Sequence, residues 1–168
     1  GWVKRQKEVK EDDKGHYVTD IAAYSATRIR EGDSLLAVLP GSTRATVAFF
    51  TNFGTCYSCR IIDVPASAGY GEPIQKLFKF KDNERVIAAV SLDPRIHKNY
   101  TPAAGAKPAA DGTPPIPPQH GIAGTSDGYA LRFSLEPHAE PSTRAGRRYA
   151  KPAEGQEVVG MYVVTGEE

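Results

Sequence analysis

The two cysteines of this chain, Cys56 and Cys59, stand in the C-x-x-C spacing of many metal sites and redox dithiols. A structural zinc site takes four ligands, commonly two such pairs or one pair with two closely spaced histidines. The chain has no second cysteine pair, and its histidines are far apart in the sequence, at His16, His97, His120 and His138. A redox dithiol requires its C-x-x-C at the start of a helix within a βαβ pattern. The elements around the cysteines therefore decide whether this spacing carries chemistry.

The residues around the cysteines predict strands. The runs VAFFTN, at 47–52, and RIIDV, at 60–64, are rich in β-branched and aromatic residues. Between them Asn52 and Gly54 are residues that adopt a positive φ, as a tight turn requires. We expect a β-hairpin that turns at 52–54 and carries both cysteines on its second strand, where residues three apart point to opposite faces. The sequence thus favours two strand cysteines over a metal or redox site.

Composition places the 168-residue chain among ordinary folded domains, with 40% hydrophobic residues, 24% charged residues and a formal net charge of +1. So small a charge argues neither for nor against nucleic acid, and only local clusters can decide. No apolar run approaches the ~20 residues that span a bilayer. The start, GWVKRQK, lacks the apolar segment of a signal peptide. We expect a cytoplasmic protein without a membrane partner and, since no Met begins it, a piece of a longer polypeptide.

The hairpin sequence recurs along the chain. TNFGTCYSCRI, at 51–61, aligns with TSDGYALRFSL, at 125–135, and the opening GWVKRQKEV is the same pattern entered at its glycine. A turn and an apolar strand follow each time, in REGDSLLAVLPG, KDNERVIAAVSLD and AEGQEVVGMYVVTG. A period of ~50 residues with four short strands per unit is typical of propellers.

These repeats divide the chain into three blades and an insertion. The blades are expected at 1–44, where the first strand is missing, at 45–93 and at 119–168. The segment 94–118 holds more than half of the 13 prolines and many alanines, a composition typical of a linker or long surface loop. No long segment keeps the i, i+3, i+4, i+7 apolar spacing of a helix, so we expect an all-β fold.

The repeats resemble the C-terminal repeats of the A subunits of DNA gyrase and topoisomerase IV. In that family a strand ends in T-x-x-G, an aromatic- and arginine-bearing strand follows, and then come a G-x-P-I loop and a strand after E-x-I/V. All of these lie between Phe49 and Val90. TSDGYALRFSL with EGQEVVG forms a second copy, and GWVKR with REGDSLLAV a third. The resemblance covers the chain except the proline-rich insertion.

The resemblance implies a β-pinwheel, a propeller-like disc whose blades exchange strands. About three four-stranded blades would lie in this chain, as part of a five- or six-bladed disc. The implied function is an accessory domain that binds double-stranded DNA around a basic rim, bends or wraps it, and presents it to the strand-passing core of a type IIA topoisomerase. Its partners would be duplex DNA, the rest of the A subunit and the ATPase B subunit, at the nucleoid in the bacterial cytoplasm.

The resemblance also implies what this part of the enzyme lacks. The family's active-site tyrosine belongs to a different domain, so this chain is expected to be non-catalytic, without cofactor or metal. Its parent would be an ATP-dependent type II topoisomerase. The gyrase box Q-R-R-G-G-K-G is absent, and the nearest stretch is STRAGRRYAK, at 142–151. The parent is therefore either a box-less topoisomerase IV-type subunit or a gyrase whose box lies elsewhere.

Basic residues form two clusters, near the N-terminus and at 142–151, and the second contains no acid. Two further arginines lie in the hairpins, where we expect them at the same place. Equivalent positions on stacked blades would form a stripe that contacts phosphates. The candidate DNA-binding residues are Lys4, Arg5, Lys7, Lys10, Arg60, Arg132, Arg144, Arg147, Arg148 and Lys151. The simpler interpretation is solvated surface charge or, for the hairpin arginines, pairing within the fold.

Two alternatives remain beside DNA binding. Propeller folds serve many functions, so the domain could be a protein–protein interaction module in which the basic loops are incidental. A redox or zinc module at the cysteines is the other. Binding to DNA would fall steeply with salt and depend little on base sequence, which separates it from both.

Overall fold

The structure is a computed structural model that describes residues 1–6, 12–16, 28–96, 107, 110 and 119–164. The described part is all-β, as expected, and its only helices are short 3-10 turns. Its strands are β1 (Trp2–Val3), β2 (Thr46–Thr51), β3 (Thr55–Arg60), β4 (Glu72–Pro73), β5 (Val86–Ser91), β6 (His120–Thr125), β7 (Ala130–Ser134), β8 (Arg147–Arg148) and β9 (Val158–Val164). The 3-10 turns are η2 (Ile61–Asp63), η3 (Ile74–Lys76) and η4 (Glu136–His138). No helix in these residues is long and apolar enough to cross a bilayer.

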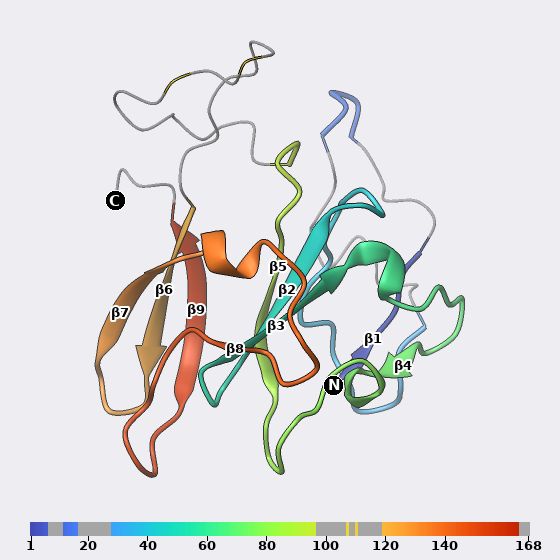
Figure 1. The fold of residues 1–168 in the computed structure, drawn as a ribbon. Helices are drawn as coiled ribbons and strands as arrows, with labels where there is room; N and C mark the ends of the chain where they lie inside the picture. The colour runs from blue at the N-terminus through green and yellow to red at the C-terminus, as the bar shows by residue number, and fades with distance from the viewer. Residues whose placement is uncertain (7–11, 17–27, 97–106, 108–109, 111–118, 165–168) are drawn as a thin grey trace.

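The strands form three sheets that stand side by side (Figure 1). The middle sheet has the order β5-β2-β3-β8, and the sheet at the C-terminal end has the order β7-β6-β9. The sheet at the N-terminal end pairs only β1 with β4. The expectation of four strands in each blade is therefore met in the middle sheet alone.

The predicted hairpin is confirmed as β2 and β3, with Phe49 opposite Tyr57. Its turn ends at Gly54, whose φ is +79° and whose amide donates to the carbonyl of Thr51. The third repeat builds the same turn, with Gly128 at φ +87° and its amide bonded to Thr125. The two hairpins are thus local structures that the turn glycines specify.

Two strands, β3 and β1, each pair with a strand from the next repeat. β3 pairs with β8, where Cys56 lies opposite Arg147. β1 pairs in the same way with β4, where Val3 lies opposite Glu72. This is the strand exchange that the resemblance implies, and it means that neither of these two sheets is built from one repeat alone.

The apolar strand expected in the first repeat is missing. β5 and β9, the corresponding strands, pair with β2 and β6. Residues 34–40 contain the equivalent apolar run, yet they form no strand. Within the described residues the first repeat has no counterpart of β2, so this run has no strand to pair with.

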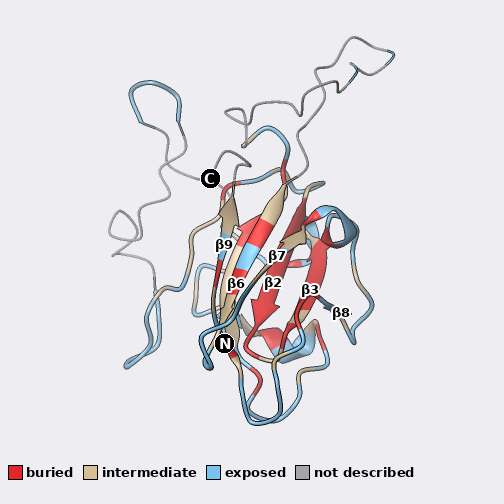
Figure 2. Cartoon of the chain, turned by 90° about the vertical axis from the view of Figure 1, so that its left-hand side faces the viewer, coloured by how far each residue is buried: buried red, intermediate tan, exposed pale blue. Residues whose placement is uncertain are grey.

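Both faces of the middle sheet are buried (Figure 2). One face, with Ala48 and Phe50, packs against residues of the β7-β6-β9 sheet such as Ala123. The other, with Phe49 and Tyr57, packs against residues of η3 and its neighbours. The middle sheet is thus the centre of the hydrophobic core, because both of its faces lie against other parts of the chain.

A buried carboxylate fixes the hairpin turn of the middle sheet. Glu84 accepts hydrogen bonds from the hydroxyls of Thr51, at 2.8 Å, and Tyr57, at 3.0 Å, and from the amide of Lys81, at 2.8 Å. Burial, followed by the neighbouring Glu84, raises the pKa of Tyr57 above its ordinary value. The phenol therefore stays a hydrogen-bond donor, which keeps this carboxylate satisfied.

Candidate nucleic-acid interface

The sheets fan out from a common inner side. The edge strands β5 and β9 lie beside each other. The opposite edge is β8 in the middle sheet and β7 in the C-terminal sheet. The exchanged strand β8 and the loops on either side of it therefore lie on the outer edge of the middle sheet (Figure 1).

Close backbone contacts hold this segment against the middle sheet. The amides of Tyr149 and Ala150 both donate to the carbonyl of Gly54, at 2.9 and 3.2 Å. The amide of Ser142 donates to the carbonyl of Ser58 at 2.9 Å, and the hydroxyl of Ser142 accepts from the amide of Ser58 at 3.1 Å. Gly146, at φ +72°, ends the turn, and an added Cβ would come within 2.9 Å of Tyr57. The basic cluster is thus presented on a rigid support.

Three cations of this cluster are free to bind a ligand. Within the described residues, Arg144, Arg148 and Lys151 have no hydrogen bond, ion pair or ring contact through their side chains. Arg148 and Lys151 line one shallow cavity of about 290 Å³, together with Phe53, Pro152 and Gln156. Two unpaired cations beside an apolar ring are suited to a phosphate group and the sugar or base attached to it.

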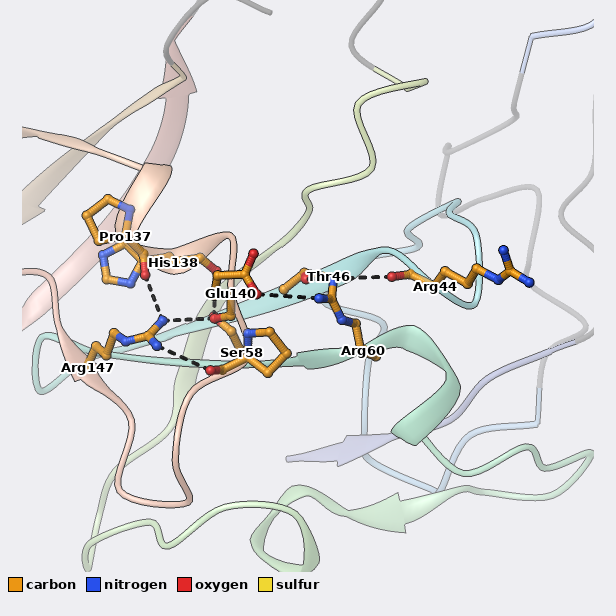
Figure 3. Close-up of polar contacts among 9 residues, drawn as sticks. Arg44, Thr46, Ser58, Arg60, Pro137, His138, Glu140 and Arg147 are labelled. Atoms are coloured by element: carbon orange, nitrogen blue, oxygen red, sulfur yellow. Dashed lines mark hydrogen bonds and ion pairs between the residues drawn. The ribbon is translucent and has the colours of Figure 1, made fainter.

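Arg147, although adjacent, is occupied by the fold (Figure 3). Its guanidinium donates to the carbonyls of Pro137, at 2.7 Å, Glu140, at 2.8 Å, and Pro141, at 3.2 Å. Burial, and then the charge of Arg147, lower the pKa of the neighbouring His138. Arg147 therefore fastens the loop after η4 to the middle sheet, and its donors are unavailable for phosphate.

Arg60 is also bound within the fold. It donates to the carbonyl of Arg44 at 3.3 Å and to the hydroxyl of Thr46 at 3.1 Å, and it pairs with Glu140 at 3.4 Å (Figure 3). The expectation that Arg60 and Arg132 occupy the same place is wrong. Arg60 lies opposite Thr46, whereas Arg132 lies opposite Ile122, two residues nearer the turn of its hairpin.

In the N-terminal cluster the two described candidates are both bound within the fold. Lys4 donates to the carbonyls of Arg28 and Gly69, each at 2.9 Å, and its pKa is lowered by burial and by the nearby Arg28. Arg5 donates through Nε to the carbonyl of Val64 at 3.1 Å. The other two candidates of this cluster, Lys7 and Lys10, lie outside the described residues.

Sequence analysis missed one basic residue near the outer edge. Arg44 and Arg60 line a second shallow hollow with Thr43 and Ile62. Among the described residues the side chain of Arg44 has no partner. Arg44 lies outside both basic clusters of the sequence. It comes close to Arg60 because Thr46, two residues after Arg44, pairs with Arg60 in the hairpin.

The cysteines lie on opposite faces of β3, as expected. Cys56 belongs to the core between the middle and C-terminal sheets, and Cys59 to the core on the other face. Both thiols are free and buried. No group of His, Cys, Asp and Glu in the described residues is arranged to hold a metal ion. The geometry separates the two thiols, so they do not form a common site.

We expect both thiols to resist modification in the folded protein. Burial raises the pKa of Cys56 and of Cys59 to about 12. Since the thiolate is the reacting species, the pKa alone slows the reaction about a thousandfold. Titration with a chromogenic disulfide reagent should show two slow thiols in buffer and two fast ones in denaturant. Fast reaction of either thiol in the native protein would contradict the geometry.

Comparison with known proteins gives relatives by sequence and by fold. The DNA gyrase A subunit of Aeromonas salmonicida is 26% identical over 144 residues, which are 84% of this chain and 13% of that protein. The E. coli ParC C-terminal domain superposes with a TM-score of 0.65 at 19% identity. The chain therefore has the fold of that domain, a β-pinwheel.

Other comparisons agree with this fold. The C-terminal domain of DNA topoisomerase IV superposes on the pinwheel with a TM-score of 0.68 at 17% identity, covering 99% of this chain and 43% of that one. The match to the ParC domain covers 98% of this chain and 53% of that one. The pinwheel thus spans about half of the solved domains and a small part of the gyrase protein. No protein-family model matches the chain.

Proposed function

We propose that this pinwheel binds duplex DNA along its outer edge and bends it, as an accessory domain of a type IIA topoisomerase A subunit. The observation that carries the proposal is the set of unpaired cations on and beside the exchanged strand β8, namely Arg144, Arg148 and Lys151. Cations on an outer edge contact phosphates without reading bases, and a duplex whose phosphates follow such cations around the domain is bent.

The rest of the proposal concerns the whole protein. The relatives named above are A-subunit proteins and domains of DNA gyrase and topoisomerase IV. We propose that the pinwheel delivers DNA to a strand-passing core, that an ATPase B subunit drives that core, and that the enzyme works at the nucleoid in the bacterial cytoplasm. In this scheme the pinwheel is non-catalytic, and 1–44, 45–93 and 119–168 are its covalent repeats, with 94–118 inserted.

Salt-dependent binding tests the site. We expect the chain to bind a labelled duplex of ~40 base pairs with an affinity that falls steeply with salt. In the double variant Arg148→Ala and Lys151→Ala, the slope of log K against log salt should become about 2 smaller in magnitude, with affinity about tenfold or more weaker at low salt. Fluorescence anisotropy measures both quantities.

A variant with the same loss of charge provides the control. Lys14 and Lys107 are exposed residues outside the basic cluster, and replacing both by alanine removes two charges as well. An equal loss of slope in this control would show that DNA does not bind at the β8 edge. No binding of the unmodified chain at low salt would instead favour the protein–protein interaction module.

A further inference from the structure

One histidine lies inside the core where the exchanged segment meets the middle sheet. His138, the last residue of η4, is 4% exposed. Its ring centroid lies 5.9 Å from that of Phe50, in the middle sheet, and 6.1 Å from that of Phe133, in the C-terminal sheet. Within the described residues its Nδ1 is enclosed and has no hydrogen-bond partner. The ring thus occupies an apolar site between two sheets.

The backbone around His138 fastens the exchanged segment to the middle sheet. The carbonyl of His138 accepts a hydrogen bond from the hydroxyl of Ser58, on β3, at 2.9 Å (Figure 3). The carbonyls of Pro137 and Glu140, on either side of it, accept from the guanidinium of Arg147. Moving the ring out of the core would therefore disturb the contacts that hold η4 and β8 in place.

Arg147 is the charged group that acts on this ring. Two other titratable groups belong to the same core, namely Tyr149, whose ring packs on both phenylalanines, and Cys56 on β3. Burial raises the pKa of Tyr149 above its ordinary value and that of Cys56 to about 12, so both stay neutral. The surroundings of His138 thus contain a cation and neutral groups.

No carboxylate among the described residues bonds to the ring. The carboxylate of Glu140, two residues along the chain, pairs with Arg60 instead. Glu136, at the start of η4, is exposed. An imidazolium at this place would therefore lack the counter-ion that stabilises most buried histidine cations.

Protonation of His138 is unfavourable in the packed state for two reasons. It adds a second cation beside Arg147, and it turns the enclosed Nδ1 into a donor without an acceptor. Burial, and then Arg147, accordingly lower the pKa of this histidine. A released histidine binds the proton more tightly, so packing is fully favourable above the ordinary histidine pKa of ~6.5 and weakens as the pH falls below it.

We propose that His138 is an acid-sensitive switch, whose protonation releases the segment from η4 through β8 from the middle sheet. The release is local, because the pairing of β2 with β3 and β5 and the core on the other face do not involve this segment. The segment carries Arg148 and Lys151 at its end. Acid would therefore remove the rigid support of the basic cluster.

The two cysteines report such a release, because Cys56 lies in the core that contains Tyr149 and Cys59 lies in the core on the opposite face. A dithiodipyridine reagent modifies thiols in acid as well, and mass spectrometry identifies the modified cysteine. Dividing each rate by the rate in denaturant at the same pH removes the pH dependence of the thiol itself. We expect this ratio to rise about tenfold for Cys56 between pH 7 and pH 5 and to stay constant for Cys59.

His138→Leu tests the cause, because leucine fills an apolar site and cannot be protonated. In this variant the ratio for Cys56 should not change with pH. His16→Gln is the control, since His16 is exposed and pairs with Asp12 outside this core, and it should leave the rise intact. A constant ratio for Cys56 in the unmodified chain, an equal rise for both cysteines, or a rise that persists in His138→Leu would each overturn the proposal.

A second measurement needs no variant and so does not depend on whether His138→Leu folds. The titration of the His138 ring in the unmodified chain, followed by NMR, should have a midpoint below the ~6.5 of a free histidine. A midpoint at or above that value would mean that the packed state accepts the proton, which would overturn the proposal.

Discussion

Replacing Gly54 by alanine is expected to lower the free energy of unfolding by about 3 kcal/mol or more. Gly54 ends the hairpin turn of the middle sheet at φ +79°, which alone costs an alanine about 1 kcal/mol. An added Cβ would also overlap the carbonyl oxygen of Ala150 and lie 2.8 Å from its carbonyl carbon. Both are backbone atoms of the exchanged segment, so neither gives way easily. Unfolding in urea measures the loss.

The equivalent glycine of the third repeat separates the two causes. Gly128 has the same turn and a φ of +87°, but no atom lies within 4 Å of an added Cβ. Gly128→Ala should therefore cost only the ~1 kcal/mol of the backbone conformation. Equal losses in the two variants would mean that the contact between Gly54 and the exchanged segment contributes nothing to stability.

Phe50→Ala is expected to lower the free energy of unfolding by about 3 to 5 kcal/mol. Phe50 is fully buried on β2, yet its aromatic partners all come from the third repeat. Its ring centroid lies 5.0 Å from that of Tyr149 and 5.9 Å from those of Phe133 and His138. The cavity would open between two sheets, so the loss of unfolding free energy measures how much the packing of one sheet on the next contributes to stability.

Phe53→Ala is the control for this change, because Phe53 lies in the turn only three residues away and is half-buried. We expect it to cost about 1 kcal/mol. Unfolding should stay a single transition in both variants, followed by tryptophan fluorescence and circular dichroism together. A loss below about 1 kcal/mol for Phe50→Ala would show that the sheets are joined chiefly by the strand exchange and not by this core.

The local parts of the fold were predictable because short stretches specify them. The hairpin at 46–60 follows from β-branched and aromatic runs around a turn glycine, and the hairpin at 120–134 follows from its alignment with that sequence. The strand exchange was expected only through the family resemblance. β8 has two residues, Arg147 and Arg148, and nothing in its composition distinguishes it from a loop. Its partner is set by tertiary contacts, which local propensity does not contain.

The candidate site was predictable as a cluster, but not residue by residue. The run of basic residues without acids predicted DNA-binding residues at 142–151, and three of its four cations have no partner among the described residues. Adjacent arginines then differ completely in role, since Arg147 donates to three carbonyls and Arg148 is unpaired. Alternation along β8 turns one side chain toward the loop after η4 and the other toward the cavity of Phe53. Sequence alone does not say which is which, because the register of β8 is not encoded locally.

Because of the exchange of β8, a repeat of the sequence and a sheet of the fold do not contain the same strands. The piece that begins at β6 carries both its own sheet and the outer strand of the sheet before it. An isolated middle repeat would lack that strand, and so would any truncation placed between the two repeats. A backbone cut between β5 and β6, by contrast, places β3 and β8 on different fragments but removes neither of them. Such a cut produces two complementary fragments that can reassemble, and the domain is therefore suited to fragment complementation and poorly suited to excision of single repeats.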